Sequence, residues 1–291
     1  GQALADIIDN SIQAGATRID IVTQSNESKK ITGFAVIDNG TGMDKDWVAG
    51  SIGFGNTSRN SKEDRDGLGR FGMGLSNAGI AFTELLQVYS RTDNLDYFMS
   101  YIDLRKGSDT EFTDEFLEEL NMRPPEPIKS ELPDWVDFYL LDNILEEDTR
   151  TIIVMDKVTP ERAKYRGVDQ FERQVTTHIA TTYYKMHDNI SIFLNGREIQ
   201  MCDPLFLTPG LRGYDLDEDR AYPLEPVDYL VKDDETDEVI GTMRARFCVM
   251  PPTFGMKQEV KEFAKNAAGK YGNSRAPIMK QFTGIIVVRN G

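Results

Sequence analysis

The start of the chain sets a helical pattern directly before two strand patterns, and this order limits the folds it can adopt. Apolar residues recur at helical spacing from Leu4 to Ile12, and Gly15 then supplies a C-terminal stop. Two strand-like runs follow, 18–23 and 31–37, separated only by a polar turn. Because so short a connection joins antiparallel strands, the sequence predicts a helix followed by a β-hairpin.

Strand and helix patterns both continue along the rest of the chain, and the change of pattern predicts two domains. The first domain is expected over residues 1–185 and the second over 186–291, with the boundary near residue 185. Further strands are expected at 85–90, 97–104, 151–156, 190–194, 197–200, 228–231, 240–249 and 284–288. Helices are expected at 171–185 and, with a basic face, near 257–268.

Composition indicates a globular protein with an ample core. The chain has 291 residues, 40% of them hydrophobic, and no apolar run long enough to cross a membrane. We therefore expect a soluble, cytoplasmic protein without a membrane partner. Two cysteines and two histidines are too few for a disulfide framework, a cysteine-based zinc site or most histidine chemistry. The opening GQALADIIDN lacks a Met and reads as helix interior, so we expect the natural chain to begin earlier and to continue past Gly291.

The charge of the chain is unevenly distributed. The net charge is −15, which argues against tight non-specific binding to nucleic acid or anionic membranes. Residues 109–148 carry fourteen acidic side chains against two basic ones, and residues 213–239 carry eleven against two. We interpret both segments as solvated acidic insertions. Residues 257–280 are basic, with six Lys or Arg against two Glu, and would suit a phosphate or a partner.

Two polar side chains in the first helix lie four residues apart. Asp6 and Asn10 therefore share one face of the helix, and the apolar residues point elsewhere. A carboxylate and an amide oxygen on one face can hold a water molecule and a hard cation such as Mg²⁺. A solvent-exposed polar face explains the same pattern, so both interpretations stay open here.

A second motif, IDNGTGM over residues 37–43, follows an apolar strand directly. A carboxylate such as Asp38 at a strand end can accept a hydrogen bond from an exocyclic amine. Glycines at positions 40 and 42 would let a flat ring approach the backbone closely. The motif suits an adenine pocket, and an ordinary Asp-Asn-Gly turn without a ligand is the alternative.

A third motif, GLGRFGMGL over residues 67–75, is a glycine-rich loop that runs into a helix expected to begin near Met73. Free backbone amides at a helix N-terminus attract phosphate. The loop lacks the Gly-Lys-Ser/Thr ending of a P-loop, and no βαβ unit surrounds it, so P-loop and dinucleotide-binding folds do not fit. Residues 53–74 show little periodicity and are expected to form a long mobile loop.

In this order and spacing, the three motifs resemble those of the GHKL ATPases, the superfamily of gyrase B subunits, heat-shock chaperones of the ninety-kilodalton class, histidine kinases and MutL. The resemblance covers residue 1 to about residue 160, and LGRFGMGLSNA at 68–78 is similar to the lid of chaperone and MORC-type members. It implies a two-layer α/β sandwich of the Bergerat type that binds ATP and Mg²⁺. The segment 53–74 would be a mobile lid, and a smaller α/β transducer-like domain would follow.

The resemblance assigns roles to residues of the first two motifs. Asn10 would bind Mg²⁺, and Asp38 would accept the adenine amino group. Gly42 and Met43 would line the base, and Ala14 would pack near the nucleotide.

Two further elements follow from the resemblance. Thr151 in RTIIVMD would be the later-strand threonine near the adenine, although Arg150 stands where a glycine is common. The lid residues would wrap the phosphates; they are Gly69, Arg70, Phe71, Gly72, Met73, Gly74 and Leu75.

The catalytic position departs from the family pattern. The general base is usually a Glu four residues before the Asn, and Asp6 stands there in this chain. Asp is one methylene shorter, and a misplacement of about 1 Å can cost roughly a hundredfold in rate. We therefore expect nucleotide binding with slow hydrolysis, with Asp9 as the runner-up base.

The second domain resembles that of MORC-type proteins more loosely, through ISIFLNGREIQMCDPLF and TGIIVVRNG. Relatives place a Lys from this domain on the terminal phosphate. Lys280 is the candidate for that role and Lys257 the alternative, and a solvated lysine explains either residue.

Together these expectations describe an ATP-dependent conformational switch. Mg²⁺-ATP would close the lid and favour a homodimer, and Asp6 would activate water for attack on the γ-phosphate. A module that binds ATP without hydrolysis and signals by occupancy is the alternative. A histidine kinase is a weaker third hypothesis, because no candidate His lies in a dimerisation helix. The sequence does not identify a protein or DNA client.

Overall fold

The structure is a computed structural model. It describes residues 2–52, 83–92, 96–103, 128–129, 131–143, 148–158, 167–216, 218–254, 275–282, 284 and 286. The chain forms two compact units. The first comprises residues 1–179 with 186–199, and the second comprises 180–185 with 200–291. The expected domain limits at 185 and 186 stay a prediction.

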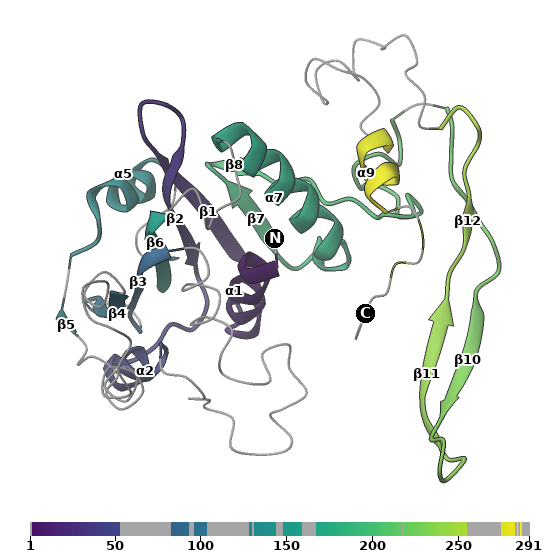
Figure 1. The fold of residues 1–291 in the computed structure, drawn as a ribbon, viewed down its shortest axis with the longest axis horizontal. Helices are drawn as coiled ribbons and strands as arrows, with labels where there is room; N and C mark the ends of the chain where they lie inside the picture. The colour runs from purple at the N-terminus through teal and green to yellow at the C-terminus, as the bar shows by residue number, and fades with distance from the viewer. Residues whose placement is uncertain are drawn as a thin grey trace, which may run out of the picture. The chain divides into compact units, whose positions relative to one another are not determined.

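The first unit is built on a mixed sheet that has eight strands in the described residues, in the order β5-β4-β3-β6-β2-β1-β7-β8 (Figure 1). The β1–β7 pair is parallel and the other neighbouring pairs are antiparallel. The strands are β1 (Arg18–Ser25), β2 (Ile31–Asp38), β3 (Thr83–Ser90), β4 (Phe98–Asp103), β5 (Ile128–Lys129), β6 (Thr151–Val158), β7 (Ser191–Leu194) and β8 (Arg197–Glu198). The expected hairpin and mixed α/β class are confirmed.

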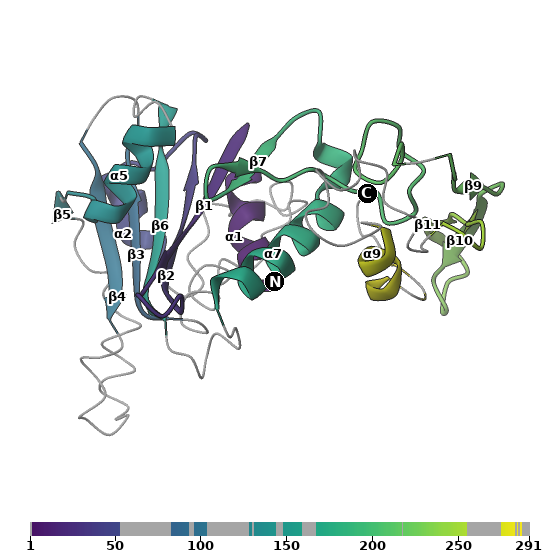
Figure 2. The ribbon, with the colours of Figure 1, turned by 90° about the horizontal axis from the view of Figure 1, so that it is seen from above.

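Helices cover both faces of this sheet. Side chains alternate along β2, so Phe34 and Val36 face one side and Ala35 and Ile37 face the other. The helices are α1 (Gln2–Gln13), α2 (Lys45–Gly50), α5 (Asp134–Asn143) and α7 (Val168–Thr182), with the 3₁₀ turn η4 (Tyr184–Met186) after α7. The Phe34 ring lies 5.8 Å from that of Phe171 on α7, and α1 lies beside α7 in both views (Figures 1 and 2).

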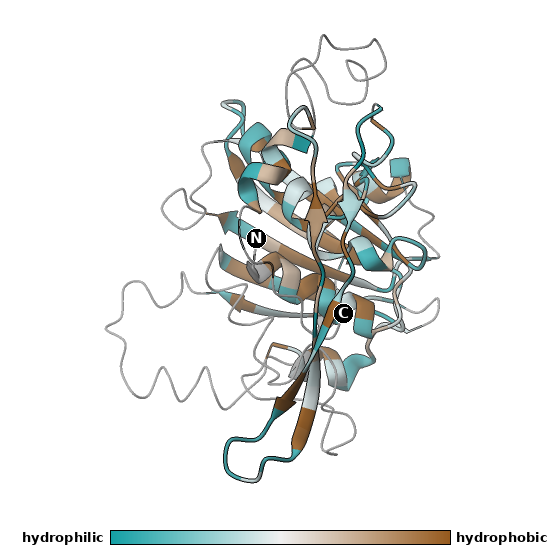
Figure 3. Cartoon of the chain, turned by 90° about the vertical axis from the view of Figure 1, so that its right-hand side faces the viewer, coloured by the Kyte–Doolittle hydropathy of each residue, from teal (hydrophilic) through white to brown (hydrophobic). Residues whose placement is uncertain are grey.

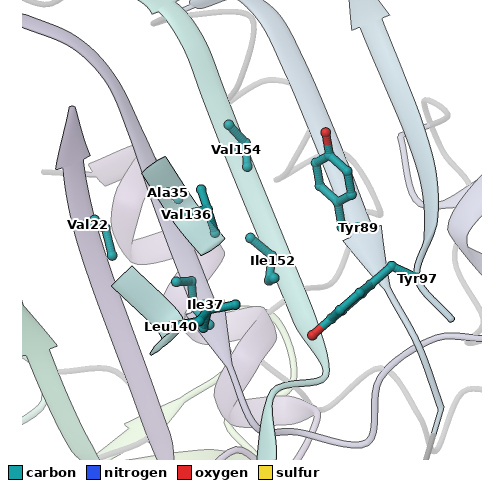
Figure 4. Packing of buried hydrophobic residues seen from close by; sticks show 9 residues of the cluster. All are labelled: Val22, Ala35, Ile37, Tyr89, Tyr97, Val136, Leu140, Ile152 and Val154. Carbon is teal, nitrogen blue, oxygen red and sulfur yellow. The ribbon is translucent and has the colours of Figure 1, made fainter. Parts of the chain in front are cut away.

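The opposite face packs against α5. Val136 and Leu140 of α5 are buried in one cluster with Ala35, Ile37 and residues from three other strands (Figure 4). Residues 134–143 lie inside the segment interpreted as a solvated acidic insertion. The interpretation as a solvated insertion therefore misses a helix that packs on the core. The acidic residues of α5 lie on its exposed side, while Val136 and Leu140 are buried.

Local signals in the sequence explain where α1 ends. Gly15 has φ +76, and its N–H bonds to the carbonyl of Ile12 at 3.0 Å. The N–H of Ala16 bonds to the carbonyl of Ser11 at 3.1 Å, which completes a Schellman motif. This ending directs the chain from α1 straight into β1, and it holds the last turns of α1 close to the end of β2.

Residues 200–291 of the second unit contain short strands and one helix in their described part. They are β9 (Tyr222–Pro223), β10 (Val227–Lys232), β11 (Val239–Ala245), β12 (Cys248–Val249) and α9 (Arg275–Gln281). Both strands of the β10–β11 hairpin contain hydrophobic residues (Figure 3), and the side chains of Leu230 and Ile240 are each 65% exposed. Buried Arg275 lies 4.0 Å from the ring centroid of Phe254 and donates to the carbonyl of Gly213.

Several expected elements differ or cannot be compared. The expected strand 240–249 is two strands, β11 and β12, and the helix expected at 171–185 ends earlier, at Thr182. The lid 53–74 and the basic helix 257–268 lie outside the described residues, as do most of 109–148 and of 284–288. Among the helices that the structure describes, none is both long and apolar enough to span a membrane.

The role of α5 in the core can be tested with two adjacent leucines. Leu140 is 1% exposed and Leu141 is 69% exposed. We expect Leu140→Ala to lower the free energy of unfolding by about 2–5 kcal/mol, because it leaves a cavity under the helix. Leu141→Ala should change it by less than about 0.5 kcal/mol. Urea unfolding of both variants measures the difference, and equal effects would mean that α5 does not dock as described.

Candidate functional site

The end of α1 is bonded to the end of β2. Ser11 Oγ donates to Asp38 Oδ2 at 2.7 Å. The backbone N–H of Thr41 donates to the carbonyl of Ala14 at 2.9 Å. Asn39 also ties this turn to the start of β1, because its Oδ1 accepts from the backbone N–H of Arg18 at 2.9 Å. The helix that carries Asp6 and Asn10 is thus held against the turn that follows Asp38.

Three polar side chains meet at the ends of three neighbouring strands. The register pairs Asp38 of β2 with Thr151 of β6, and Thr151 with Ser90 of β3. All three face the α1 side of the sheet, since they share alternation with Phe34. Residues distant in sequence are therefore aligned across the sheet, and Thr151 lies beside Asp38 despite the preceding arginine.

Ser90 connects this row to the loop after Asp38. Its hydroxyl lies 2.9 Å from that of Thr151 and accepts from the backbone N–H of Met43 at the same distance. It also lies 3.1 Å from the carbonyl of Arg150, to which it can donate. Ser90 is fully buried, so these bonds orient the Thr151 hydroxyl and hold the Met43 backbone.

The Asp38 carboxylate is buried, with 5% of the residue exposed. Burial raises the pKa of this carboxyl, while hydrogen bonds from Ser11 and from the backbone N–H of Gly40 act in the opposite direction. A carboxylate can accept about four hydrogen bonds, and these two leave it with capacity for a further donor. A ligand amine is a donor of the required kind.

Gly40 and Gly42 were expected to let a flat ring approach the backbone, and the structure shows other reasons for a glycine at each position. A Cβ at Gly40 would lie 2.9 Å from the Ala14 side chain, so its absence lets the turn approach α1. Gly42 has φ +70, and a Cβ there would overlap the carbonyl oxygen of Arg91. Both glycines are thus needed by the protein's own backbone, and the role of Gly42 in lining a base stays a prediction.

Asp6 and Asn10 lie on the same face of α1 and are both partly exposed. Partial burial raises the pKa of the Asp6 carboxyl. Within the described ranges, no group of three or more His, Cys, Asp or Glu side chains could form a metal site. A single amide oxygen with a nearby carboxylate still fits Mg²⁺, which keeps most of its water and binds substrate phosphates.

The roles of the remaining predicted residues stay predictions. The lid residues Gly69 to Leu75 and the alternative lysine Lys257 lie outside the described residues. Lys280 is exposed on α9 in the second unit. Ser11 and Ser90 could not be recognised from the sequence as site residues. Their signals there are weak: Ser11 follows Asn10, and Ser90 ends an apolar strand.

The mixed sheet, the helix held against a strand end and the buried carboxylate are consistent with an ATPase domain of the Bergerat type. Residues 1–129 match the family model described as histidine kinase-, DNA gyrase B-, and HSP90-like ATPase. This part of the chain is a member of the GHKL superfamily.

Named relatives agree with this assignment. The chain is 35% identical to mouse (Mus musculus) ATPase MORC2B over 32% of its length and 9% of the relative's. It is 27% identical to human (Homo sapiens) ATPase MORC2 over 69% of its length and 19% of the relative's. It is 33% identical to the DNA mismatch repair protein MutL of Shewanella sediminis over 36% of its length and 16% of the relative's. The chain spans less than a fifth of each of these relatives.

The raised pKa of Asp38 predicts a pH-dependent stability that Asp38→Asn removes. The folded-state pKa lies above the unfolded value, so the carboxyl costs no stability below the unfolded pKa and progressively lowers stability as the pH rises through the folded pKa. Without ligand, the free energy of unfolding of Asp38→Asn minus that of wild type should therefore grow from about pH 4 to pH 7. Urea titrations across this range measure it, and a constant or falling difference would contradict the assigned burial.

Proposed function

We propose that this chain is a Mg²⁺-dependent ATP-binding switch that hydrolyses ATP slowly. The observation that carries the proposal is the buried Asp38 carboxylate at the strand end, bonded to the helix that carries Asp6 and Asn10. Membership of residues 1–129 in an ATPase superfamily supports the same nucleotide.

Adenine recognition would rest on the row of strand-end side chains. Asp38 accepts a hydrogen bond from the exocyclic amine, and the Thr151 hydroxyl next to it supplies a second polar contact to the base. Ser90 holds Thr151 and the Met43 backbone in place, so little side-chain entropy is lost on binding. Gly42 and Met43 line the base.

The phosphates would lie along the exposed face of α1. Asn10 would hold Mg²⁺, which would neutralise negative charge on the phosphates. Residues 69–75 of the lid wrap the phosphates through their backbone amides. Lid closure would then favour a homodimer in a cytoplasmic protein, and Lys280 would reach the terminal phosphate.

Asp6 would act as the general base for hydrolysis. It lies one turn before Asn10, so its carboxylate and the metal-binding amide point to the same region. The carboxylate orients a water molecule and accepts its proton during attack on the γ-phosphate. Its shorter side chain, compared with the glutamate usual in the family, favours slow turnover.

The presence of Asp6 where the family usually has a glutamate also supports a second candidate function. In it, the chain is an ATP-binding module that signals by occupancy without hydrolysis. Wild-type phosphate release above that of a buffer control favours the ATPase, and release equal to the control favours the module. MORC2 is named an ATPase, and MutL is named a DNA mismatch repair protein. We propose ATPase activity for this chain and no role in DNA repair.

We expect Asp38→Asn to weaken ATP binding at least about tenfold, because the amide places a donor opposite the adenine amine. Isothermal titration with Mg²⁺ and a non-hydrolysable ATP analogue measures the dissociation constant. Asp137→Asn removes an exposed carboxylate from α5 and should bind as wild type does. Equal binding by wild type and Asp38→Asn would overturn the adenine assignment.

Substitutions at Asp6 separate catalysis from binding. Asp6→Ala should lower turnover by roughly a hundredfold or more, the usual contribution of a general base. Asp6→Glu should raise it, because the added methylene restores the reach of the carboxylate. Both variants should keep the wild-type affinity for the ATP analogue within about threefold. Loss of turnover in Asp9→Ala but not in Asp6→Ala would transfer the role to Asp9.

A further inference from the structure

A second surface lies on α5, away from the residues of the nucleotide site. A groove of about 390 Å³ runs between α5 and the end of β1. Its lining includes the aromatic residues Trp135, Phe138 and Tyr139, the carboxylate of Asp142, and the amide of Asn195. Val22 also lines it and belongs to the cluster on the α5 face of the sheet, the face opposite Asp38.

The aromatic residues of the groove share one side of α5. They occupy positions i, i+3 and i+4 of the helix, which places them next to one another. The helix is already anchored by Val136 and Leu140, which are buried. Phe138 is 65% exposed, and Trp135 is half-buried because it also packs against the core cluster. The groove therefore presents the ring of Phe138 and the exposed part of Trp135 to a ligand.

Hydrogen bonds fix the shape of the groove. Tyr139 donates to Asp20 at 2.8 Å and accepts from the backbone N–H of Gly196 at 3.0 Å. Asn195 donates to Glu172 at 2.7 Å. The Tyr139 ring and the Asn195 amide are thus held by bonds to the sheet and to α7, and a ligand would meet a largely preformed surface.

The charge around the groove is negative. Helix α5 carries Asp134, Asp137 and Asp142 and no Lys or Arg. Arg18 reaches the carbonyl of Asn143 beside the groove, but Asp20 binds its guanidinium at 2.7 Å and the ring of Phe193 lies under it. A cation at the groove would therefore be attracted by carboxylates without displacing this ion pair.

We propose that this groove binds a lysine side chain presented by a basic polypeptide segment. The methylene stem packs on Trp135 and Phe138, and the ammonium group lies over an aromatic face within reach of Asp142. Exposed aromatic rings beside a carboxylate are the chemistry that recognises such a cation. The acidic segment 109–148, with fourteen carboxylates against two basic residues, favours basic partners over anionic ones.

The groove has its own spectroscopic probe. The chain contains two tryptophans, and Trp47 on α2 is the other one. In a Trp47→Phe background, the emission reports only on Trp135. A short peptide of glycine and lysine should shift this emission in a saturable way, in the absence of nucleotide. The same peptide with acetylated lysines keeps its length but loses the charge, and should have no effect.

Two variants of the groove and two matched controls then test the assignment. Phe138→Ser and Asp142→Asn should each weaken peptide binding roughly two- to fivefold, the effect of one cation–π or surface ionic contact. The controls lie in the second unit: Phe247→Ser removes an exposed ring, and Asp234→Asn removes an exposed charge. Both should leave peptide binding unchanged. Circular dichroism checks that each variant is folded.

The proposal fails if the lysine peptide leaves Trp135 emission unchanged, if the acetylated peptide binds equally well, or if the groove and control variants weaken binding alike. A change of emission with protein concentration alone, without peptide, would identify a second copy of the chain as the occupant and would also overturn it. ATP binding is measured in a separate titration. The peptide-binding result and the ATP-binding result can therefore fail independently of one another.

Discussion

The hydrogen bond between Ser11 and the buried Asp38 carboxylate is the interaction on which the candidate site depends. It joins α1 to β2 across the helix–sheet interface at 2.7 Å, and it partly offsets the cost of burying a carboxylate. A protein selected for stability alone would place an apolar side chain here. A buried carboxylate with unused acceptor capacity lowers stability in the unliganded state, and this pattern is typical of binding sites.

Alternation along β2 divides the sheet into two chemically distinct faces. The residues in phase with Asp38 form the side of the candidate site, where α1 and α7 pack, and the residues in phase with Ile37 form the apolar base under α5. Because the period of a strand is two, a shift of one residue would exchange these faces. The β1–β2–β6–β3 register therefore aligns Asp38, Thr151 and Ser90 and also fixes where α5 docks.

Much of the first unit could be predicted because its signals are local. The spacing of apolar residues identifies α1, Gly15 marks its end, and Asn195-Gly196 marks the β7–β8 turn, where both residues have positive φ. Contacts that depend on strand order could not be predicted in the same way. The pairing of Ser90 with Thr151 joins residues 61 positions apart, and only the register of β3 against β6 brings them together.

The two glycines after Asp38 show how a correct position can be predicted for an incomplete reason. A glycine there was expected to admit a flat ring, whereas the structure uses Gly40 to let the turn contact Ala14 and Gly42 to pass the Arg91 carbonyl. These requirements are compatible, because a turn that packs closely on α1 also keeps bulky side chains away from Asp38.

Helix α5 shows why charge alone is a weak guide to burial. Its sequence, DWVDFYLLDN, carries three carboxylates and sits in a segment with a large acidic excess, which favoured a solvated insertion. Val136 and Leu140 are its buried side chains, and the half-buried Trp135 and Tyr139 pack against the same cluster. The other side chains of the helix lie in solvent. Its aromatic and acidic side chains are then available for a ligand, while the carboxylates discourage the apolar rings from aggregating with other copies.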